Sequence, residues 1–180
     1  MNVKLLAQAF GILGVILFVL SFQIKSNKKL YFVQIMANIM FAIQFILLGA
    51  YVGCFSLLIC IVRNALFMNR RKWKFVDSPV TLIVLLALYL LNTILNWNAW
   101  YDILPLAAVV SATVAFWTGN PRSIRTYNLF IASPSWMAYD ICVGAWAGVL
   151  NEAIGMASII VSIIRFGWKA LGEGGDEFEK

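Results

Sequence analysis

Histidine is absent from the sequence, and the three cysteines, Cys54, Cys60 and Cys142, form no CxxC pair. Because zinc sites depend mainly on these two residue types, we expect no metal and no other cofactor. No GxSxG motif occurs, and Asp140 has no second aspartate deep in an apolar segment with which to form an aspartyl-protease pair. The last apolar segment also lacks the central lysine that retinal attachment needs. We therefore expect neither an enzyme nor a photoreceptor.

Charge is scarce as well. Charged residues make up 12% of the chain and apolar residues 62%, whereas a soluble domain has about a quarter charged and roughly half apolar residues. The net charge of +6 comes from short basic clusters between long apolar runs, a distribution typical of membrane topology signals and not of a nucleic-acid interface. We predict an all-α integral membrane protein with the lipid bilayer as partner and no nucleic acid.

Seven apolar segments are each close to the roughly 20 residues that cross a bilayer core. They cover residues 4–24, 30–50, 51–68, 79–97, 100–118, 127–147 and 149–168. The first is expected to be a retained helix, because no A-x-A cleavage site accompanies it. The Gly-rich, acidic tail at 170–180 is expected to be disordered.

A sequence pattern occurs twice. GAYVG at 49–53 returns as GAWAG, with Gly144 lying 95 positions after Gly49. The same offset pairs Asn38 with Ser133 and Phe41 with Trp136. Beyond the corner, an offset of 102 pairs Ser56, Cys60 and Arg63 with Ser158, Ser162 and Arg165. The added length is about two helical turns, which returns the same face to the same side.

Residues 79–97 have no counterpart in this internal repeat, so they are interpreted as a linker helix. We predict seven transmembrane helices in a 3+1+3 arrangement with two parallel triple-helix bundles. The bundles would occupy 1–70 and 99–169, with a basic loop and the linker helix in 71–98. Most lysines and arginines then fall on one side of the membrane, in or beside 25–29, 69–74, 119–123 and the tail. The positive-inside rule places the N-terminus outside and the C-terminus in the cytoplasm.

This plan resembles that of the sugar-efflux SWEET transporters and the wider PQ-loop superfamily over nearly the full chain. More closely, LAQAFGILGVILFVLSF, FILLGAYVG with IVRNALF, and ILPLAAVV with SIIRF resemble the bacterial inner-membrane family named YgjV. The resemblance implies a multi-pass protein of the bacterial inner membrane whose two bundles work by alternating access.

SWEET transporters have prolines in the first two helices of each bundle, thought to act in gating. Pro105 and Pro134 match this pattern in the second bundle, whereas residues 4–50 contain no proline and the chain has no Pro-Gln pair. Bending of the first bundle would then fall to Gly11 and Gly14. The resemblance implies these four residues as hinges and leaves specificity for sugars unsupported.

Polar and aromatic residues recur on inward faces of the second and sixth segments. They are Gln34, Asn38, Phe41 and Gln44 in the first half, and Ser133, Trp136, Tyr139 and Asp140 in the second. Such a mixture suits a small polar solute that stacks on rings and hydrogen-bonds to amides and hydroxyls. From this set we predict solute contacts by Asn38, Phe41, Gln44, Ser133, Trp136 and Tyr139, with the Asn38–Ser133 and Phe41–Trp136 pairs preferred. Ordinary hydrogen bonding between helices is the alternative.

Helical spacing also places small and charged residues on one face of the third and seventh segments. In the functional interpretation these faces meet at a central pathway, where Asn64 contacts the solute and Arg63 and Arg165 are intramembrane charges. In the structural interpretation the small residues permit close packing, and the arginines extend to the cytoplasmic headgroups.

Asp140 is the acid that lies well inside an apolar segment, and such groups can relay protons in transporters. It is therefore a candidate for proton coupling, with an ion pair or a position near the outer interface as alternatives. Asp102 and Glu152 are expected near the outer surface in solvated roles.

Taken together, the sequence predicts a SWEET-like carrier that moves a small polar, uncharged solute, such as a sugar-like, nucleoside-like or vitamin-precursor molecule. A structural or regulatory inner-membrane protein without transport activity is the alternative. The substrate, the direction of transport and assembly into a homo-oligomer are left open.

Overall fold

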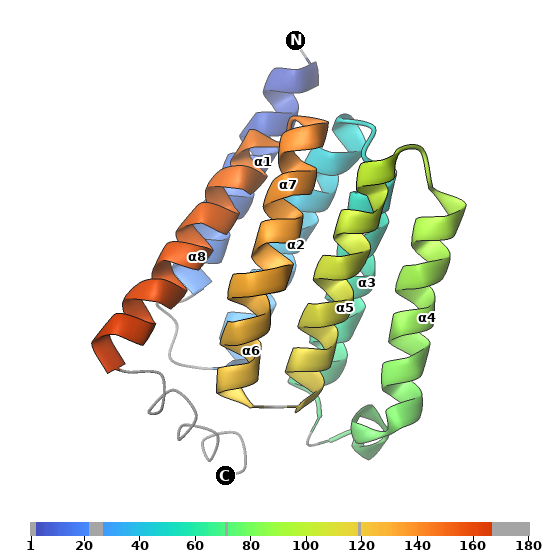
Figure 1. The fold of residues 1–180 in the computed structure, drawn as a ribbon, viewed down its shortest axis with the longest axis vertical. Helices are drawn as coiled ribbons and strands as arrows, with labels where there is room; N and C mark the ends of the chain where they lie inside the picture. The colour runs from blue at the N-terminus through green and yellow to red at the C-terminus, as the bar shows by residue number, and fades with distance from the viewer. Residues whose placement is uncertain (1–2, 22–26, 71, 119, 167–180) are drawn as a thin grey trace.

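The computed structural model describes residues 3–21, 27–70, 72–118 and 120–166. Their elements are α1 (Val3–Ser21), α2 (Asn27–Leu47), α3 (Tyr51–Met68), η1 (Lys74–Asp77), α4 (Pro79–Leu95), η2 (Trp100–Asp102), α5 (Ile103–Thr118), α6 (Pro121–Tyr127), η3 (Asn128–Ala132), α7 (Ser133–Val143) and α8 (Trp146–Phe166). Because α6, η3 and α7 follow one another without a break, they form one continuous rod (Figure 1). The tail predicted at 170–180 lies outside the described residues.

Several of these helices are apolar enough for a bilayer. Val3–Leu20, Tyr51–Met68 and Trp100–Thr118 have the length and composition to cross one, and Phe32–Leu47, Pro79–Leu95 and Trp146–Val161 are shorter apolar helices. Large apolar side chains are also exposed on the helices, for example Ile83 at 64% and Leu95 at 72% on α4. Exposed apolar surface of this kind marks contact with a membrane or a partner. The all-α architecture is therefore confirmed, and three of the described helices have the length and composition to cross a membrane.

Two glycine corners end α2 and the α6–η3–α7 rod earlier than the sequence predicted. Gly49 and Gly144 have φ angles of 73° and 74°, in the left-handed region, where glycine carries no Cβ penalty. The bonds around them match: Ala50 N donates to Phe45 O at 2.9 Å, and Ala145 N donates to Asp140 O at 2.8 Å. The two halves of the repeat therefore share one C-cap geometry.

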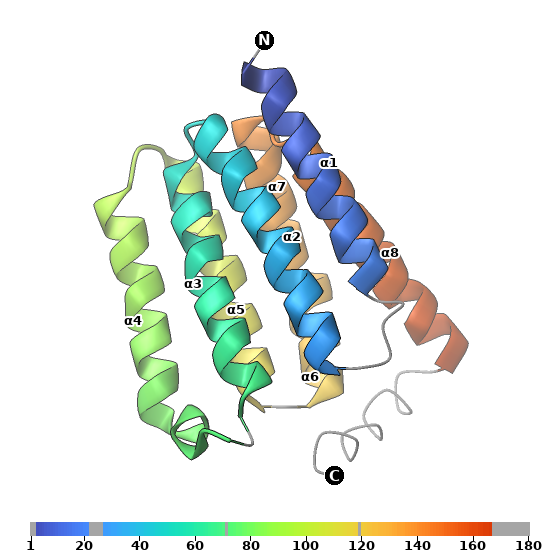
Figure 2. The ribbon, with the colours of Figure 1, turned by 180° about the vertical axis from the view of Figure 1, so that it is seen from behind.

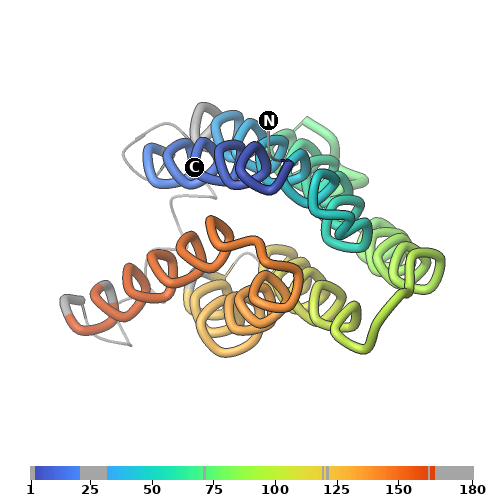
Figure 3. Tube along the Cα trace, turned by 90° about the horizontal axis from the view of Figure 1, so that it is seen from above, coloured from blue at the N-terminus to red at the C-terminus, as the bar shows by residue number. Residues whose placement is uncertain are grey.

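The helices stand in two layers, shown from behind in Figure 2 and along the helix axes in Figure 3. In one layer α1 packs on α2 and α2 on α3; in the other α5 packs on α7 and α7 on α8. Across the layers α1 meets α8 and α3 meets α5, while α4 contacts α3 and α5 at one edge. Both glycine corners lie at the same end of the molecule, opposite the α3–η1 connection (Figure 1).

Candidate functional site

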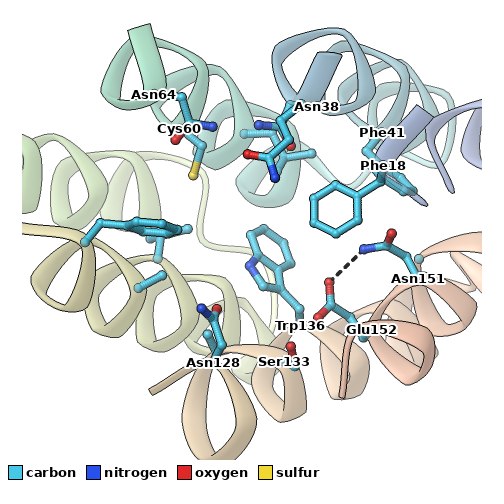
Figure 4. A pocket seen from close by; sticks show the side chains of 18 of the residues that line it. Phe18, Asn38, Phe41, Cys60, Asn64, Asn128, Ser133, Trp136, Asn151 and Glu152 are labelled. Atoms are coloured by element: carbon cyan, nitrogen blue, oxygen red, sulfur yellow. Dashed lines mark hydrogen bonds between the residues drawn. The ribbon is translucent and has the colours of Figure 1, made fainter. Parts of the chain in front are cut away.

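A cavity of about 550 Å³ lies between the two layers. Helices α1, α2 and α3 form one wall, and α5, the α6–η3–α7 rod and α8 form the other. Figure 4 shows Asn38 and Asn64 on one wall, Ser133 and Glu152 on the other, and the ring of Trp136 between them. Polar groups and aromatic rings from both layers therefore surround one space.

The lining follows the sequence repeat. At the offset of 95, the paired lining residues on α2 and α7 are Asn38 with Ser133, Phe41 with Trp136, and Phe45 with Asp140. The paired lining residues on α3 and α8 are Leu57 with Glu152, Cys60 with Gly155, Arg63 with Ser158, and Asn64 with Ile159. Equivalent positions of the two halves thus line opposite walls.

The second offset found in the sequence, 102, does not describe these helices. Helix α3 begins at Tyr51 and α8 at Trp146, so the offset of 95 continues through both. The offset of 102 differs from it by seven residues, or about two turns, so it pairs residues on the same face of the helix but at a different depth in the molecule. The lining pair at the level of Arg63 is therefore Ser158, and not Arg165. The side chains of Ser162 and Arg165 fall outside the described part of the chain.

Five of the seven predicted solute contacts line the cavity: Asn38, Phe41, Asn64, Ser133 and Trp136.

Gln44 and Tyr139 lie behind the lining and are fully buried. The Gln44 amide donates to Gln8 Oε1 at 3.1 Å, and the Tyr139 hydroxyl accepts from Gly53 N at 3.1 Å. Gln8 in turn donates to Gly144 O at 2.8 Å. These two residues join helices instead of facing the cavity, as the alternative interpretation of hydrogen bonding between helices described.

The proposed hinge glycines are tightly packed. A Cβ on Gly11 would overlap Gln44 and Ala147, and one on Gly14 would lie 3.1 Å from the ring of Phe41. These glycines allow α1 to approach its neighbours, and their action as hinges remains a prediction.

The hinge prolines have different surroundings. Pro105 is buried near the start of α5, and Pro134 is the second residue of α7, just after η3. Their gating role likewise remains a prediction.

Helix η3 is a π-helix, whose hydrogen bonds reach one residue further than those of an α-helix. It therefore adds one residue to the α6–η3–α7 rod. This insertion is visible in the spacing of the sequence repeat. Asn38 and Ser133 lie 95 positions apart, whereas the next lining pair, Gln34 and Asn128, lies 94 apart. The insertion keeps Asn128 facing the cavity.

Arg63 lies toward the α3–η1 end and is 6% exposed. Its guanidinium donates to Thr113 Oγ1 on α5 at 3.0 Å and to Asn64 Oδ1 at 3.1 and 3.3 Å. It also lies 5.1 Å from the ring centre of Phe116, within cation–π range. This residue therefore connects the two layers at one end of the cavity, and it does not simply extend to the headgroups.

Carboxyl and amide groups gather at the opposite end of the cavity. Asp140 is 2% exposed and Asn151 is 8% exposed, and both line the space. The Asn151 amide donates to the Glu152 carboxylate at 3.2 Å (Figure 4). Glu152 therefore lines the cavity and does not lie at the outer surface as the sequence suggested.

Asp102 differs from its expected solvated role as well. It is 4% exposed, and its Oδ2 accepts from the backbone N–H groups of Asn98 and Ala99 at 2.8 and 2.9 Å. This carboxylate caps η2 and takes no part in the cavity.

Several lining residues were not identified from the sequence, among them Phe18, Arg125, Asn128, Gly148, Asn151 and Gly155. A signal for those on α8 was present, because Gly148, Asn151, Gly155 and Ser158 recur at helical spacing. Applying the offset of 95 past the corner would have placed them opposite the face of α3.

Fold and cavity define an all-helical membrane protein with a polar, aromatic site between two helical layers. The chain belongs to the Imp-YgjV family, described as bacterial inner membrane protein, whose family model matches residues 5–170. No curated protein and no solved structure matches the chain.

Proposed function

We propose that the protein is a SWEET-like carrier, and not an enzyme, that moves a small polar solute across the inner membrane by alternating access. The two triple-helix bundles would be α1–α3 and the group of α5, α6–η3–α7 and α8, with α4 as the linker. The solute class would be sugar-like, nucleoside-like or a vitamin precursor.

One observation carries this proposal: residues at equivalent positions of the repeat line opposite walls of a single cavity. In transporters built from repeats, the substrate site lies where the repeats meet, and rocking of one repeat against the other exposes it to each side. The Arg63–Thr113 bond joins α3 to α5 at one end, and the Gln8–Gly144 bond joins α1 to the α7–α8 corner at the other. Such contacts are suitable closures for the two ends.

We further propose that the N-terminus is outside and the C-terminus cytoplasmic, since the basic starts of α2 and η1 lie at the end opposite the glycine corners (Figure 1). Asp140 remains the proposed proton-coupling residue, because buried carboxyls in transporters commonly relay protons.

The test combines binding with transport. Purified protein is screened by thermal shift against sugars, nucleosides, vitamins and amino acids, because a ligand that binds the folded state raises its apparent stability. A hit is then measured for uptake into proteoliposomes. We expect W136A or N38A to lower uptake by about tenfold, the loss that corresponds to about 1.4 kcal/mol. W97A, which removes a half-exposed tryptophan outside the cavity, is the matched control. Undiminished uptake by W136A and N38A would refute the site, and a folded protein that takes up none of the solutes would favour the non-transporting alternative.

A further inference from the structure

The end of the cavity near the glycine corners holds more hydrogen-bond acceptors than donors. Within the described residues, Asp140 Oδ1 and Asn151 Oδ1 are buried without a hydrogen-bond partner. The amide group of Asn151 cannot reach its own oxygen, and it is already directed at the Glu152 carboxylate. Buried polar atoms in folded proteins are almost always paired, so this cluster calls for a donor from outside the chain.

The basic side chains of the cavity stand at its other end. Arg63 lies twelve positions after Tyr51, the first residue of α3, which corresponds to about 18 Å along a helix. Arg125 belongs to α6, before the π-helix. Asp140, by contrast, is four positions before Gly144 at the corner. Both arginines therefore lie several helical turns from Asp140, and a pair of carboxylates in a membrane interior is costly without a positive charge beside it.

The neighbouring side chains favour an organic cation over a metal ion. Calcium takes six to eight oxygen ligands and magnesium nearly ideal octahedral geometry, while the described residues contain no group of three or more His, Cys, Asp or Glu able to hold a metal. Next to the carboxyls the lining is instead aromatic, with Phe18, Phe41 and Trp136. Aromatic rings attract ammonium groups through their faces.

We propose that the cavity binds the primary ammonium group of a small solute between Asp140, Asn151 and Glu152, with the body of the solute against Trp136. An ammonium group offers three donors and no acceptor, which matches the oxygens of these three residues. This inference rests on the proposed function, and it replaces the uncharged solute expected from the sequence with an amine-bearing one.

The experiment compares amines with neutral molecules of the same shape. Thermal shifts of the purified full chain are measured with glucosamine against glucose and with 2-phenylethylamine against 2-phenylethanol, at equal ionic strength. Sodium chloride alone serves as the inorganic control. We expect at least one amine to raise the apparent unfolding temperature in a saturable manner. Its shift should be larger than the shifts produced by its neutral counterpart and by sodium chloride.

Variants locate the effect. E152Q and D140N should each weaken amine binding by about tenfold or more, because each removes a charge-assisted hydrogen bond, which is stronger than one between neutral groups. D77N is the matched control, since Asp77 is exposed and pairs with Arg70 outside the cavity. If D140N does not fold, E152Q decides, because Glu152 is less buried than Asp140 and glutamine has nearly the same shape as glutamate.

Four results would overturn the amine proposal. They are no shift with either amine, equal shifts within each pair, amine binding that persists in E152Q and D140N, and an equal effect of sodium, which would favour an inorganic cation. A shift with the neutral molecules that disappears in W136A would leave the carrier proposal standing while removing the ammonium site. The two proposals can therefore fail separately.

Discussion

The hydroxyl group of Tyr139 on α7 accepts a hydrogen bond from the backbone N–H of Gly53 near the start of α3, over 3.1 Å. A Cβ on Gly53 would lie 2.7 Å from a ring carbon of Tyr139, so the close approach of ring and backbone requires glycine. N–H groups in the first turn of a helix have no partner within that helix. Tyr139 supplies one from the other layer and thereby joins the two halves beside the glycine corners.

Replacing Tyr139 with phenylalanine should destabilise the protein. The variant keeps the ring but leaves the buried Gly53 N–H without an acceptor, which costs about 1–3 kcal/mol. Thermal or denaturant unfolding in detergent measures the loss. Y51F is the control, because Tyr51 is 47% exposed. Equal stabilities of Y139F and Y51F would show that the contact contributes nothing.

Much of the fold could be predicted from apolar length and from the two glycine corners. The bounds predicted for 51–68 and 100–118 agree with those of α3 and of η2 with α5, because Gly49 and the turn before Trp100 mark where the preceding helices have ended. Helix α4 begins at the predicted Pro79, where the Ser78 hydroxyl caps it by accepting from Val80 N at 3.3 Å. These are local signals, and local signals can be read from a single sequence.

Depth and register were harder to predict. Glu152 was expected near the surface because the predicted seventh segment begins at residue 149. Helix α8 begins at Trp146 instead, so Glu152 lies about 9 Å along the helix. The π-helix before Ser133 packs on α5 and α8, which lie far from it in the sequence or follow it, and in the sequence it changes only the spacing from Gln34 to Asn128. The face of a helix follows from residue periodicity, but the level at which two helices meet does not.

The proposed orientation predicts where reporter enzymes will be active. Alkaline phosphatase, which folds outside the inner membrane, is fused after Lys74 or after Asn98. We expect activity only from the fusion after Asn98, because the basic loop at 69–74 should stay in the cytoplasm. A green fluorescent protein fused at the same two positions should give the opposite pattern. Activity after Lys74 would contradict the orientation.

Gly148 should be sensitive to substitution because of its contact with Asp140. A Cβ at this position would overlap both carboxylate oxygens of Asp140, whereas a Cβ on Gly155 would meet nothing within 4 Å. Both glycines lie on α8 and line the cavity. We expect G148A to lower the apparent unfolding temperature and to weaken amine binding by displacing the carboxylate. G155A should retain both properties, and a G148A protein that binds amines as well as G155A would separate Asp140 from the ligand.

Asp140 should also determine how transport responds to pH. Protons and ammonium groups compete for the same carboxyl oxygens, so acidification should reduce amine uptake by the unsubstituted protein. Glu152 on α8 is the titratable group whose charge acts on Asp140, and it can still bind a proton when Asp140 is replaced. We therefore expect D140N to take up less solute and to show a flatter pH profile, and E152Q to retain a response to pH through Asp140. Uptake into proteoliposomes is measured across a pH series with no membrane potential, so that only the protonation of the site changes. A D140N profile that follows the unsubstituted protein at every pH would leave Asp140 with a structural role and assign the pH response to Glu152.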